Sequence, residues 1–248
     1  MITHGNARRA NYYHWFHEVV LRLYGILERL PPDTRFVVPP HRLKFQDEML
    51  DVVRIRRDRL CEFGGEGAVR FENLYFSPPT SHLYLDSPQA DRWFREQVFA
   101  AYKLKFGAAR RRIYITRRTA AYRRIVNETE IEPVLREFDF EVHQLERYSL
   151  REQAALFSEA EIVVSPSGAG LTNVVFAPPG LIVVDIFEMT RVNKPFWSLC
   201  TALGHSYWYL IGETVPSGVA IAGDIHLPVD KGRRALAAVT SRPLGGPE

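Results

Sequence analysis

A run of 23 residues without a charged side chain, residues 162–184, most constrains what this chain can fold into. It is long enough to cross a bilayer as a helix, which takes about 20 mostly apolar residues. Three prolines and three glycines interrupt the run, however, and a continuous helix does not tolerate them. The run instead predicts a strand at residues 162–165, a loop with a short helix, a turn, and a second strand at residues 181–187. We therefore expect no transmembrane segment here.

Predicted strands and helices alternate through the second half of the chain. Capping-box patterns, in which a polar residue is followed three positions later by a glutamate, begin two of the helices at Asn127 and Ser149. Several strands are apolar throughout, and such strands alternate with helices in parallel sheets that are covered on both faces. The strands are expected at residues 112–116, 140–143, 162–165, 181–187 and 207–211, and the helices at residues 127–138, 149–160 and 194–203.

The first half is less regular but also alternates. Trp15, Val19, Leu23 and Leu27 recur at every fourth position, which predicts an amphipathic helix over residues 11–30. Further strands are expected at residues 35–38, 52–55 and 74–76, and further helices at residues 43–50 and 88–106. The chain as a whole is thus expected to be α/β, with two Rossmann-like halves, residues 1–106 and residues 107–248, and a cleft between them.

The basic residues of this chain are concentrated in one segment. The formal net charge is only +3, yet nine lysines and arginines and no acidic residue lie between Gln97 and Asn127. Such a segment suits a phosphate-bearing partner, and a solvated basic surface is the alternative. A nucleic-acid partner is disfavoured, because only Tyr114 and Tyr122 stand among these arginines, whereas single strands are held on several stacked aromatic side chains.

A glycine-rich turn follows the predicted strand at residues 162–165. Gly168 and Gly170 allow a ligand to approach the backbone, and a helix beginning there would offer free amide groups to an anion. The spacing matches neither a dinucleotide-binding fingerprint nor a P-loop. An ordinary glycine-rich turn is therefore the alternative interpretation.

Arg117 and Arg118 follow the predicted strand at residues 112–116. In a parallel sheet they would lie at the same carboxyl edge as the glycine-rich turn, where ligands of open α/β sheets bind. Guanidinium groups bind phosphate oxygens in pairs. The two features together predict a diphosphate site. The alternative is that both arginines form surface ion pairs with Glu128, Glu130 or Glu188.

His14 and Glu18 are four residues apart and share one face of the predicted N-terminal helix. A carboxylate beside an imidazole can orient the ring or raise its basicity, so the pair is a candidate general base. The alternative is a hydrogen-bonded histidine with a structural role.

Several catalytic patterns are absent from the sequence. There is no D-x-D pair, no H-E-x-x-H and no G-x-S-x-G, and the two cysteines, Cys61 and Cys200, are far apart. We therefore expect no metal site, no serine hydrolase and no cofactor.

An ordered set of motifs resembles glycosyltransferase family 61, from Asn11 to about Asp230. The motifs are NxxHWxxE from residue 11, RIYITRR from 112, RIVNE from 124, SxxEQ from 149, AEIVVSPSGAGLTN from 160, FAPPG from 176, DIFE from 185, GHxYxY from 204 and GDIHLPVD from 223. The family usually has histidine where this chain has Ser167, and most relatives carry a longer segment before the first motif.

The resemblance implies a GT-B fold and an inverting, metal-independent transfer from a nucleotide sugar, which we expect to be linked to UDP, to a glycan or a lipid-linked saccharide. The chain is similar to bacterial members of the family that are linked to surface polysaccharide. This similarity implies a cytoplasmic enzyme at the inner face of the membrane. His14 or Glu18 is then the catalytic base. The expected donor-binding residues are Arg117, Arg118, Ser167, Gly168, Ala169, Gly170, Asn173 and Glu188. A nucleotide-sugar-binding homologue without turnover remains the alternative.

Overall fold

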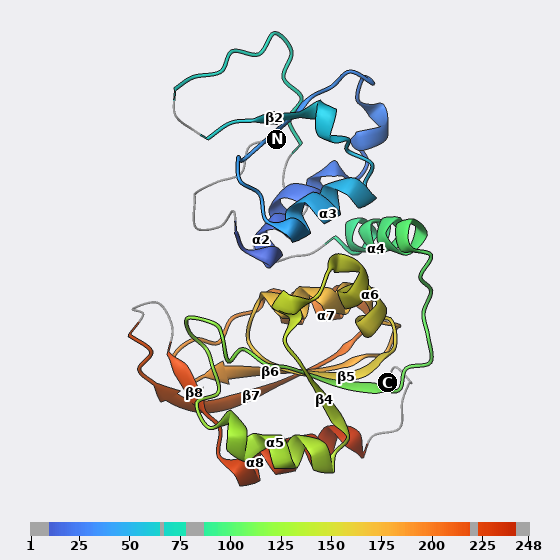
Figure 1. The fold of residues 1–248 in the computed structure, drawn as a ribbon. Helices are drawn as coiled ribbons and strands as arrows, with labels where there is room; N and C mark the ends of the chain where they lie inside the picture. The colour runs from blue at the N-terminus through green and yellow to red at the C-terminus, as the bar shows by residue number, and fades with distance from the viewer. Residues whose placement is uncertain (1–9, 65–66, 78–86, 219–222, 242–248) are drawn as a thin grey trace. The chain divides into compact units, whose positions relative to one another are not determined.

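The computed structural model describes residues 10–64, 67–77, 87–218 and 223–241. The chain divides into two compact units (Figure 1). The first unit comprises Met1–Leu104 with Ser149–Arg151, and the second comprises Lys105–Tyr148 with Glu152–Glu248. The opening residues 1–9 lie outside the described part.

The second unit is built on a six-stranded sheet in the order β4-β3-β5-β6-β7-β8. The strands are β3 (Arg111–Ile115), β4 (Phe140–His143), β5 (Ala160–Pro166), β6 (Ile182–Glu188), β7 (Ser206–Val215) and β8 (Asp224–His226). The first five in this order are parallel, and β8 pairs with β7 in the antiparallel direction. The predicted α/β class and parallel sheet are therefore confirmed, whereas the short β8 was not predicted.

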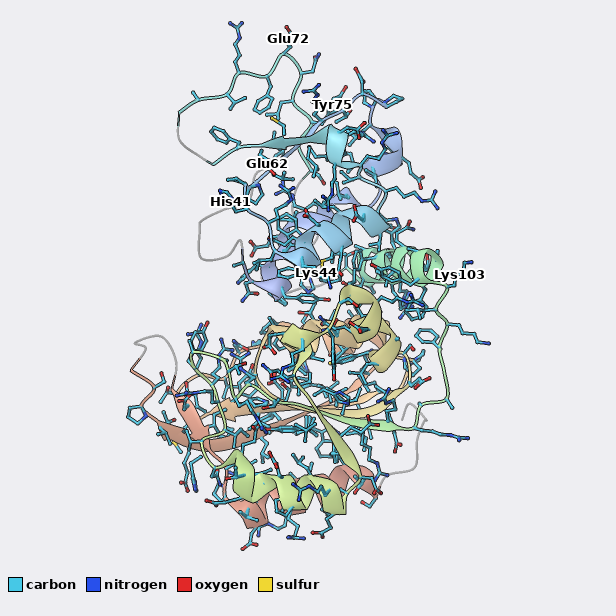
Figure 2. All side chains as sticks on the ribbon, viewed as in Figure 1. His41, Lys44, Glu62, Glu72, Tyr75 and Lys103 are labelled. Atoms are coloured by element: carbon cyan, nitrogen blue, oxygen red, sulfur yellow. The ribbon has the colours of Figure 1, made fainter. Side chains whose placement is uncertain are left out.

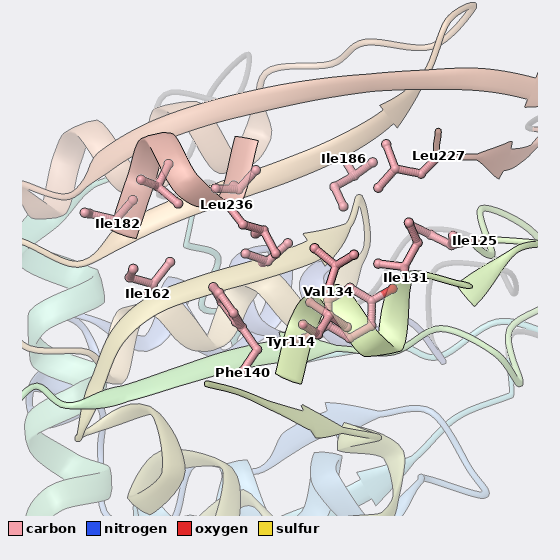
Figure 3. Close-up of a cluster of buried hydrophobic side chains, with 14 of the residues drawn as sticks. Tyr114, Ile125, Ile131, Val134, Phe140, Ile162, Ile182, Ile186, Leu227 and Leu236 are labelled. Atoms are coloured by element: carbon pink, nitrogen blue, oxygen red, sulfur yellow. The ribbon is translucent and has the colours of Figure 1, made fainter. Parts of the chain in front are cut away.

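Helices cover both faces of this sheet (Figure 1). One face carries α5 (Glu128–Glu137) and α8 (Val229–Thr240), and the other carries α6 (Leu150–Phe157) and α7 (Pro195–Leu203). Between the sheet and the first pair lies a cluster of buried side chains, among them Ile162, Ile182, Leu236 and Phe140 (Figure 3). Each fully buried aliphatic side chain of this kind contributes about 1.5–3 kcal/mol to folding. The sheet is thus a rigid base for the loops at its carboxyl edge.

Asn127 differs from its predicted role as a helix cap. Helix α5 begins at the next residue, as expected, but the Asn127 side chain makes no capping bond to it. Instead its amide nitrogen donates to the Leu227 carbonyl at 2.9 Å, and its amide oxygen accepts from the Leu227 amide at 3.0 Å. Asn127 therefore ties the start of α5 to the chain segment between β8 and α8.

The predicted N-terminal helix changes its geometry along its length. It starts as α2 (Tyr12–Trp15), continues as the π-helix η1 (Phe16–Val20) and ends as the 3-10 turn η2 (Leu21–Leu23). Tyr24 is extended and Gly25 has a φ of 72°, so the helix stops there, and only the short turn η3 (Leu27–Arg29) follows. The prediction of one regular helix to residue 30 was wrong.

The rest of the first unit contains a small parallel sheet. Strand β1 (Phe36–Val38) pairs with β2 (Leu60–Glu62), and the helices are α3 (Lys44–Val52), the 3-10 turn η4 (Arg57–Arg59) and α4 (Pro88–Tyr102). Figure 2 marks Lys44, where α3 begins, and Glu62, where β2 ends. Within the described residues the sheet of this unit has two strands, which is smaller than a Rossmann-like half.

Two strands predicted in the first unit are absent. Residues 52–55 form the end of α3 and a turn in which Arg54 has a φ of 62°, and residues 74–76 are irregular. The apolar side chains Val52, Val53 and Ile55 are nevertheless buried, so their β-like composition reflects burial and not an extended backbone.

Nowhere in the described residues is there a helix that combines the length and the apolar character needed to span a membrane.

Candidate functional site

Arg117 and the glycine-rich turn come together at the carboxyl edge of the parallel sheet. Arg117 follows β3 and Gly168 follows β5, and these two strands are paired neighbours. A Cβ atom added to Gly168 would lie 2.1 Å from Nη1 and 2.9 Å from Cζ of Arg117. The guanidinium therefore lies directly against the backbone of the turn.

A second arginine, Arg123, reaches the same turn. Its Nη1 donates to the carbonyl oxygen of Ser167 at 2.9 Å, while Nη2 of Arg117 donates to the carbonyl oxygen of Tyr122 at 3.1 Å. Arg123 has a φ of 57°, a left-handed conformation that few non-glycine residues adopt and that occurs preferentially at functional sites. The sequence does not single out Arg123 among the nine basic residues of its segment.

The side chains of Arg117 and Arg123 are half-buried and incompletely paired. In the part of the chain that the structure describes, the Nε–H groups of Arg117 and Arg123 are buried without a hydrogen-bond partner. Burial, together with the positive charge of Arg123, lowers the pKa of Arg117 to about 10. With a pKa of about 10, the Arg117 guanidinium stays charged at neutral pH. An anion between the two guanidiniums would relieve their repulsion and accept hydrogen bonds from the free Nε–H groups.

Asp185 lies fully buried next to this pair. It belongs to β6, and its Oδ2 accepts a hydrogen bond from the Tyr207 hydroxyl at 2.9 Å. Burial raises the pKa of Asp185 to about 7, although Tyr207, Ser167 and the two guanidiniums act in the opposite direction. The DIFE motif contains this residue, but nothing in the spacing marks it as part of the site.

The turn itself is held by close packing. Gly168 has an extended backbone with a φ of −175°, so the reason for glycine there is the contact with Arg117. Gly170 packs against Leu145, and a Cβ atom added to it would lie 3.2 Å from that side chain. The helix that begins at Ala169 is the 3-10 helix η6 (Ala169–Phe176). Its first amide groups have no acceptor within the helix and are available to an anion.

Asn173 and Glu188, two further expected donor contacts, are engaged by protein groups. The Asn173 amide nitrogen donates to Oε1 of Gln153 at 2.8 Å and to the Gly170 carbonyl at 3.1 Å. Glu188 accepts hydrogen bonds from Thr190 and Thr214. Burial acts to raise the pKa of Glu188, but the hydrogen bonds from Thr190 and Thr214 outweigh it and the pKa is lowered. Asn173 thus holds the turn to Gln153 of α6, and Glu188 holds the residues after β6 to Thr214 of β7.

Arg118 is held away from the turn by two carboxylates. Its Nε donates to Glu128 at 3.0 Å and its Nη2 donates to Glu132 at 2.7 Å. Other arginines of the basic segment are also paired: Arg111 with Glu141, Arg112 with Glu161, and Arg124 with Asp224. Much of the positive charge that the segment carries is therefore neutralised locally, which leaves Arg117 and Arg123 as the pair at the turn.

His14 and Glu18 form a hydrogen-bonded pair in the first unit. His14 Nδ1 lies 2.6 Å from Glu18 Oε1, and both side chains are about one-third exposed, at 29% and 33%. Asn11 caps the helix, because its side chain accepts a hydrogen bond from the His14 amide at 3.3 Å. Glu18 lies in the π-helix η1, and π-helical turns occur frequently at functional sites. The next histidine, His17, is buried and packs on the Tyr13 ring.

The described residues hold no group of three or more histidine, cysteine, aspartate or glutamate side chains that could bind a metal ion. The second unit thus carries one group of candidate residues, Arg117, Arg123 and the turn, and the first unit carries a separate group, His14 and Glu18.

Comparison with known proteins identifies the family. The family model described as Glycosyltransferase 61 matches residues 12–184, a range that contains His14, Arg117, Arg123 and the glycine-rich turn. Among curated proteins there is no match to this chain. Because the model covers more than half of the sequence in one ordered stretch, the chain belongs to glycosyltransferase family 61.

Proposed function

We propose that this chain transfers a sugar from a UDP-linked donor to a hydroxyl group of a glycan or lipid-linked saccharide, with inversion at the anomeric carbon. Its family supports glycosyl transfer as the class of reaction. One observation carries the assignment of the donor site: Arg117 lies against Gly168 while Arg123 donates to the Ser167 carbonyl. Two half-buried guanidiniums and the first amides of a helix are suited to a diphosphate.

On the donor side, the leaving UDP gains negative charge as the sugar–phosphate bond breaks. Donors that are already in place stabilise this charge more effectively than water, because they need no reorganisation during the reaction. We assign this task to Arg117, Arg123 and the amides of Ala169 and Gly170. In this proposal the guanidiniums supply the positive charge, so that transfer needs no divalent metal.

On the acceptor side, the attacking hydroxyl must lose a proton. We assign the base to His14 or Glu18, which are joined by their 2.6 Å hydrogen bond. Inversion requires the base to act on the face of the sugar opposite the leaving diphosphate. We propose accordingly that residues 1–106 form the acceptor half and residues 107–248 the donor half of a GT-B transferase.

A donor screen tests this proposal. A ligand that binds only the folded state raises the melting temperature, so UDP-, GDP-, CMP- and dTDP-sugars are compared by thermal unfolding, with and without EDTA. We expect stabilisation by UDP-sugars in both conditions, and the Arg117→Ala variant should lose it. If a sugar linked to another nucleotide stabilises the chain instead, the donor belongs to that class. If no nucleotide sugar stabilises it, the proposed nucleotide site does not exist.

Ser167 favours a second candidate, a nucleotide-sugar-binding homologue without turnover. It occupies the position at which the family usually has histidine, and it is fully buried in this chain. The two candidates differ in product formation. Transfer or slow hydrolysis of the donor that stabilises the protein supports the enzyme, whereas binding without any release of UDP supports the homologue.

A further inference from the structure

Asp185 is surrounded by charged and polar groups from three other elements. Asp185 is paired in register with Ser165 of β5, and the Ser167 amide donates to the carbonyl of the next residue, Ile186, at 2.8 Å. The carboxylate thus lies beside the turn that Arg117 and Arg123 contact, and the charges of both arginines act on it there. Tyr207 reaches it from β7. The Cys200 thiol of α7 is a further titratable group near Tyr207. The Asp185 side chain has no exposed surface.

The carboxylate influences the guanidiniums through space. The described residues show no hydrogen bond or ion pair between Asp185 and either arginine, although the charges of both arginines act on it. Its Oδ2 is bonded to Tyr207, and its Oδ1 is buried without a hydrogen-bond partner in the described part. The three side chains together carry a charge of +1 when Asp185 is ionised and +2 when it is protonated.

We propose that Asp185 determines how strongly Arg117 and Arg123 hold a diphosphate, and that a proton from solvent is taken up at its Oδ1 when the diphosphate binds. This inference rests on the donor site proposed above. An anion binds more strongly to a cluster of charge +2 than to one of +1, so binding favours the protonated form. By the same linkage, removal of the proton favours release of the anion.

The same linkage couples product release to the Asp185 proton. UDP is more highly charged than the donor sugar nucleotide, because its terminal phosphate is free, so UDP favours the protonated form of Asp185 more strongly than the donor does. Release of UDP should therefore be accompanied by loss of the Asp185 proton, and it should become more favourable as the pH rises through the range in which Asp185 ionises.

Titration calorimetry tests the inference, with UDP and with inorganic pyrophosphate as ligands. Measurements at pH 7 in two buffers of different ionisation enthalpy give the number of protons taken up on binding. The wild-type chain should take up more protons than Asp185→Asn, by a fraction of one proton per site. Asp185→Asn should also bind UDP about tenfold more tightly than the wild type at pH 8, and the difference should shrink toward pH 6. Protons that the free ligand binds or releases are the same for both proteins, so they cancel in the difference between the two proton uptakes.

A second variant, Tyr207→Phe, keeps the test decisive if Asp185→Asn does not fold. Tyr207 stabilises the carboxylate, so its removal should shift the pH at which UDP affinity falls to a higher value. Three outcomes would each overturn this inference: equal proton uptake in the wild type and Asp185→Asn, weaker UDP binding by Asp185→Asn, or an unchanged pH profile of UDP affinity in Tyr207→Phe. The proposed function would still stand in these cases, because UDP binds. Absence of binding by UDP and pyrophosphate overturns both.

Discussion

The guanidinium of Arg117 occupies the space in which a side chain on Gly168 would begin, since an added Cβ atom would lie 2.1 Å from Nη1. Gly168 is extended, and its backbone conformation is open to any residue. Glycine is required there because of this contact, and the contact fixes where the positive charge lies relative to the turn. Substitutions that separate the two residues therefore test the donor site without disturbing the sheet.

Gly168→Ala should displace Arg117 and weaken UDP binding by about tenfold, as expected for one lost charge-assisted contact. Because the clash is with a side chain that can move, the melting temperature should change little. Gly64→Ala is the control, since the nearest atom to an added Cβ atom there is 3.9 Å away. Wild-type affinity in Gly168→Ala would show that the contact does not position Arg117 for binding.

Arg117 and Arg118 should behave differently although they are adjacent. Arg117→Lys keeps the charge but loses the planar fork of donors, so UDP affinity should fall about tenfold to hundredfold, and Arg123→Lys should behave similarly. Arg118→Lys should leave UDP affinity unchanged, because Arg118 is engaged by Glu128 and Glu132. Calorimetry on the three variants gives the comparison. If Arg118→Lys lowers UDP affinity more than Arg117→Lys does, Arg118 contacts the nucleotide.

The fold of the second unit is well predicted from the sequence because its strands are buried on both faces. Strands such as β5 and β6 are apolar along most of their length, and that pattern has few other interpretations. The antiparallel strand β8 has only three residues, one of them the buried Asp224 paired with Arg124, so it gives no apolar run. In helix α8 the first residue, Val229, is followed by five charged residues or glycine (DKGRR), so its apolar residues recur only in the second half of the helix.

The same reasoning explains why Arg118 was preferred to Arg123 as a donor residue. Both Arg117 and Arg118 follow a strand, but successive side chains of an extended chain point to opposite sides, so only one of them could face the turn. Arg123 reaches the turn through a left-handed backbone conformation within a loop. No periodic pattern in a sequence indicates such a conformation. The burial of Asp185 is equally hidden, because it depends on the packing of β6 against β7.

Glu18→Gln should reduce turnover by about 10²- to 10⁴-fold, the usual contribution of a general base and its partner, while UDP affinity stays unchanged. The carboxylate bonded to His14 is lost in this variant, whereas the side-chain volume is kept. Glu28→Gln, at an exposed position of the same unit, is the control. Product formation is measured with the donor identified by thermal unfolding. Retained turnover in Glu18→Gln and in His14→Gln would transfer the role of base to another residue.

Asn127→Ala should destabilise the chain by about 2–4 kcal/mol. The substitution leaves the Leu227 amide and carbonyl without their partners at a buried position, and each unpaired buried group costs about 1–3 kcal/mol. Asn127→Asp offers both an acceptor and an O–H donor while its new carboxyl group is protonated, so at such a pH it should lose less stability than Asn127→Ala. Urea unfolding gives the free energies. A loss below about 0.5 kcal/mol in Asn127→Ala would mean that water replaces both bonds.

Asp185 should make the stability of the ligand-free chain depend on pH in a characteristic window. Burial raises its pKa to about 7 in the folded chain, whereas an aspartate in the unfolded chain titrates near 3.9. The folded state therefore favours the protonated carboxyl group. Its contribution to stability is fully present below pH 4 and is lost as the pH rises through 7. Over that window the wild type should lose on the order of 4 kcal/mol relative to Asp185→Asn, in which the group cannot ionise.

Urea unfolding of both proteins at intervals from pH 4 to pH 8 measures this difference, and other titrating groups cancel in the comparison. The opposite sign is also informative. If the wild type gains stability over Asp185→Asn as the pH rises, the two guanidiniums outweigh burial and hold Asp185 ionised throughout. The cluster at the turn would then carry a fixed charge of +1, and its affinity for a diphosphate would follow only the charge of the ligand.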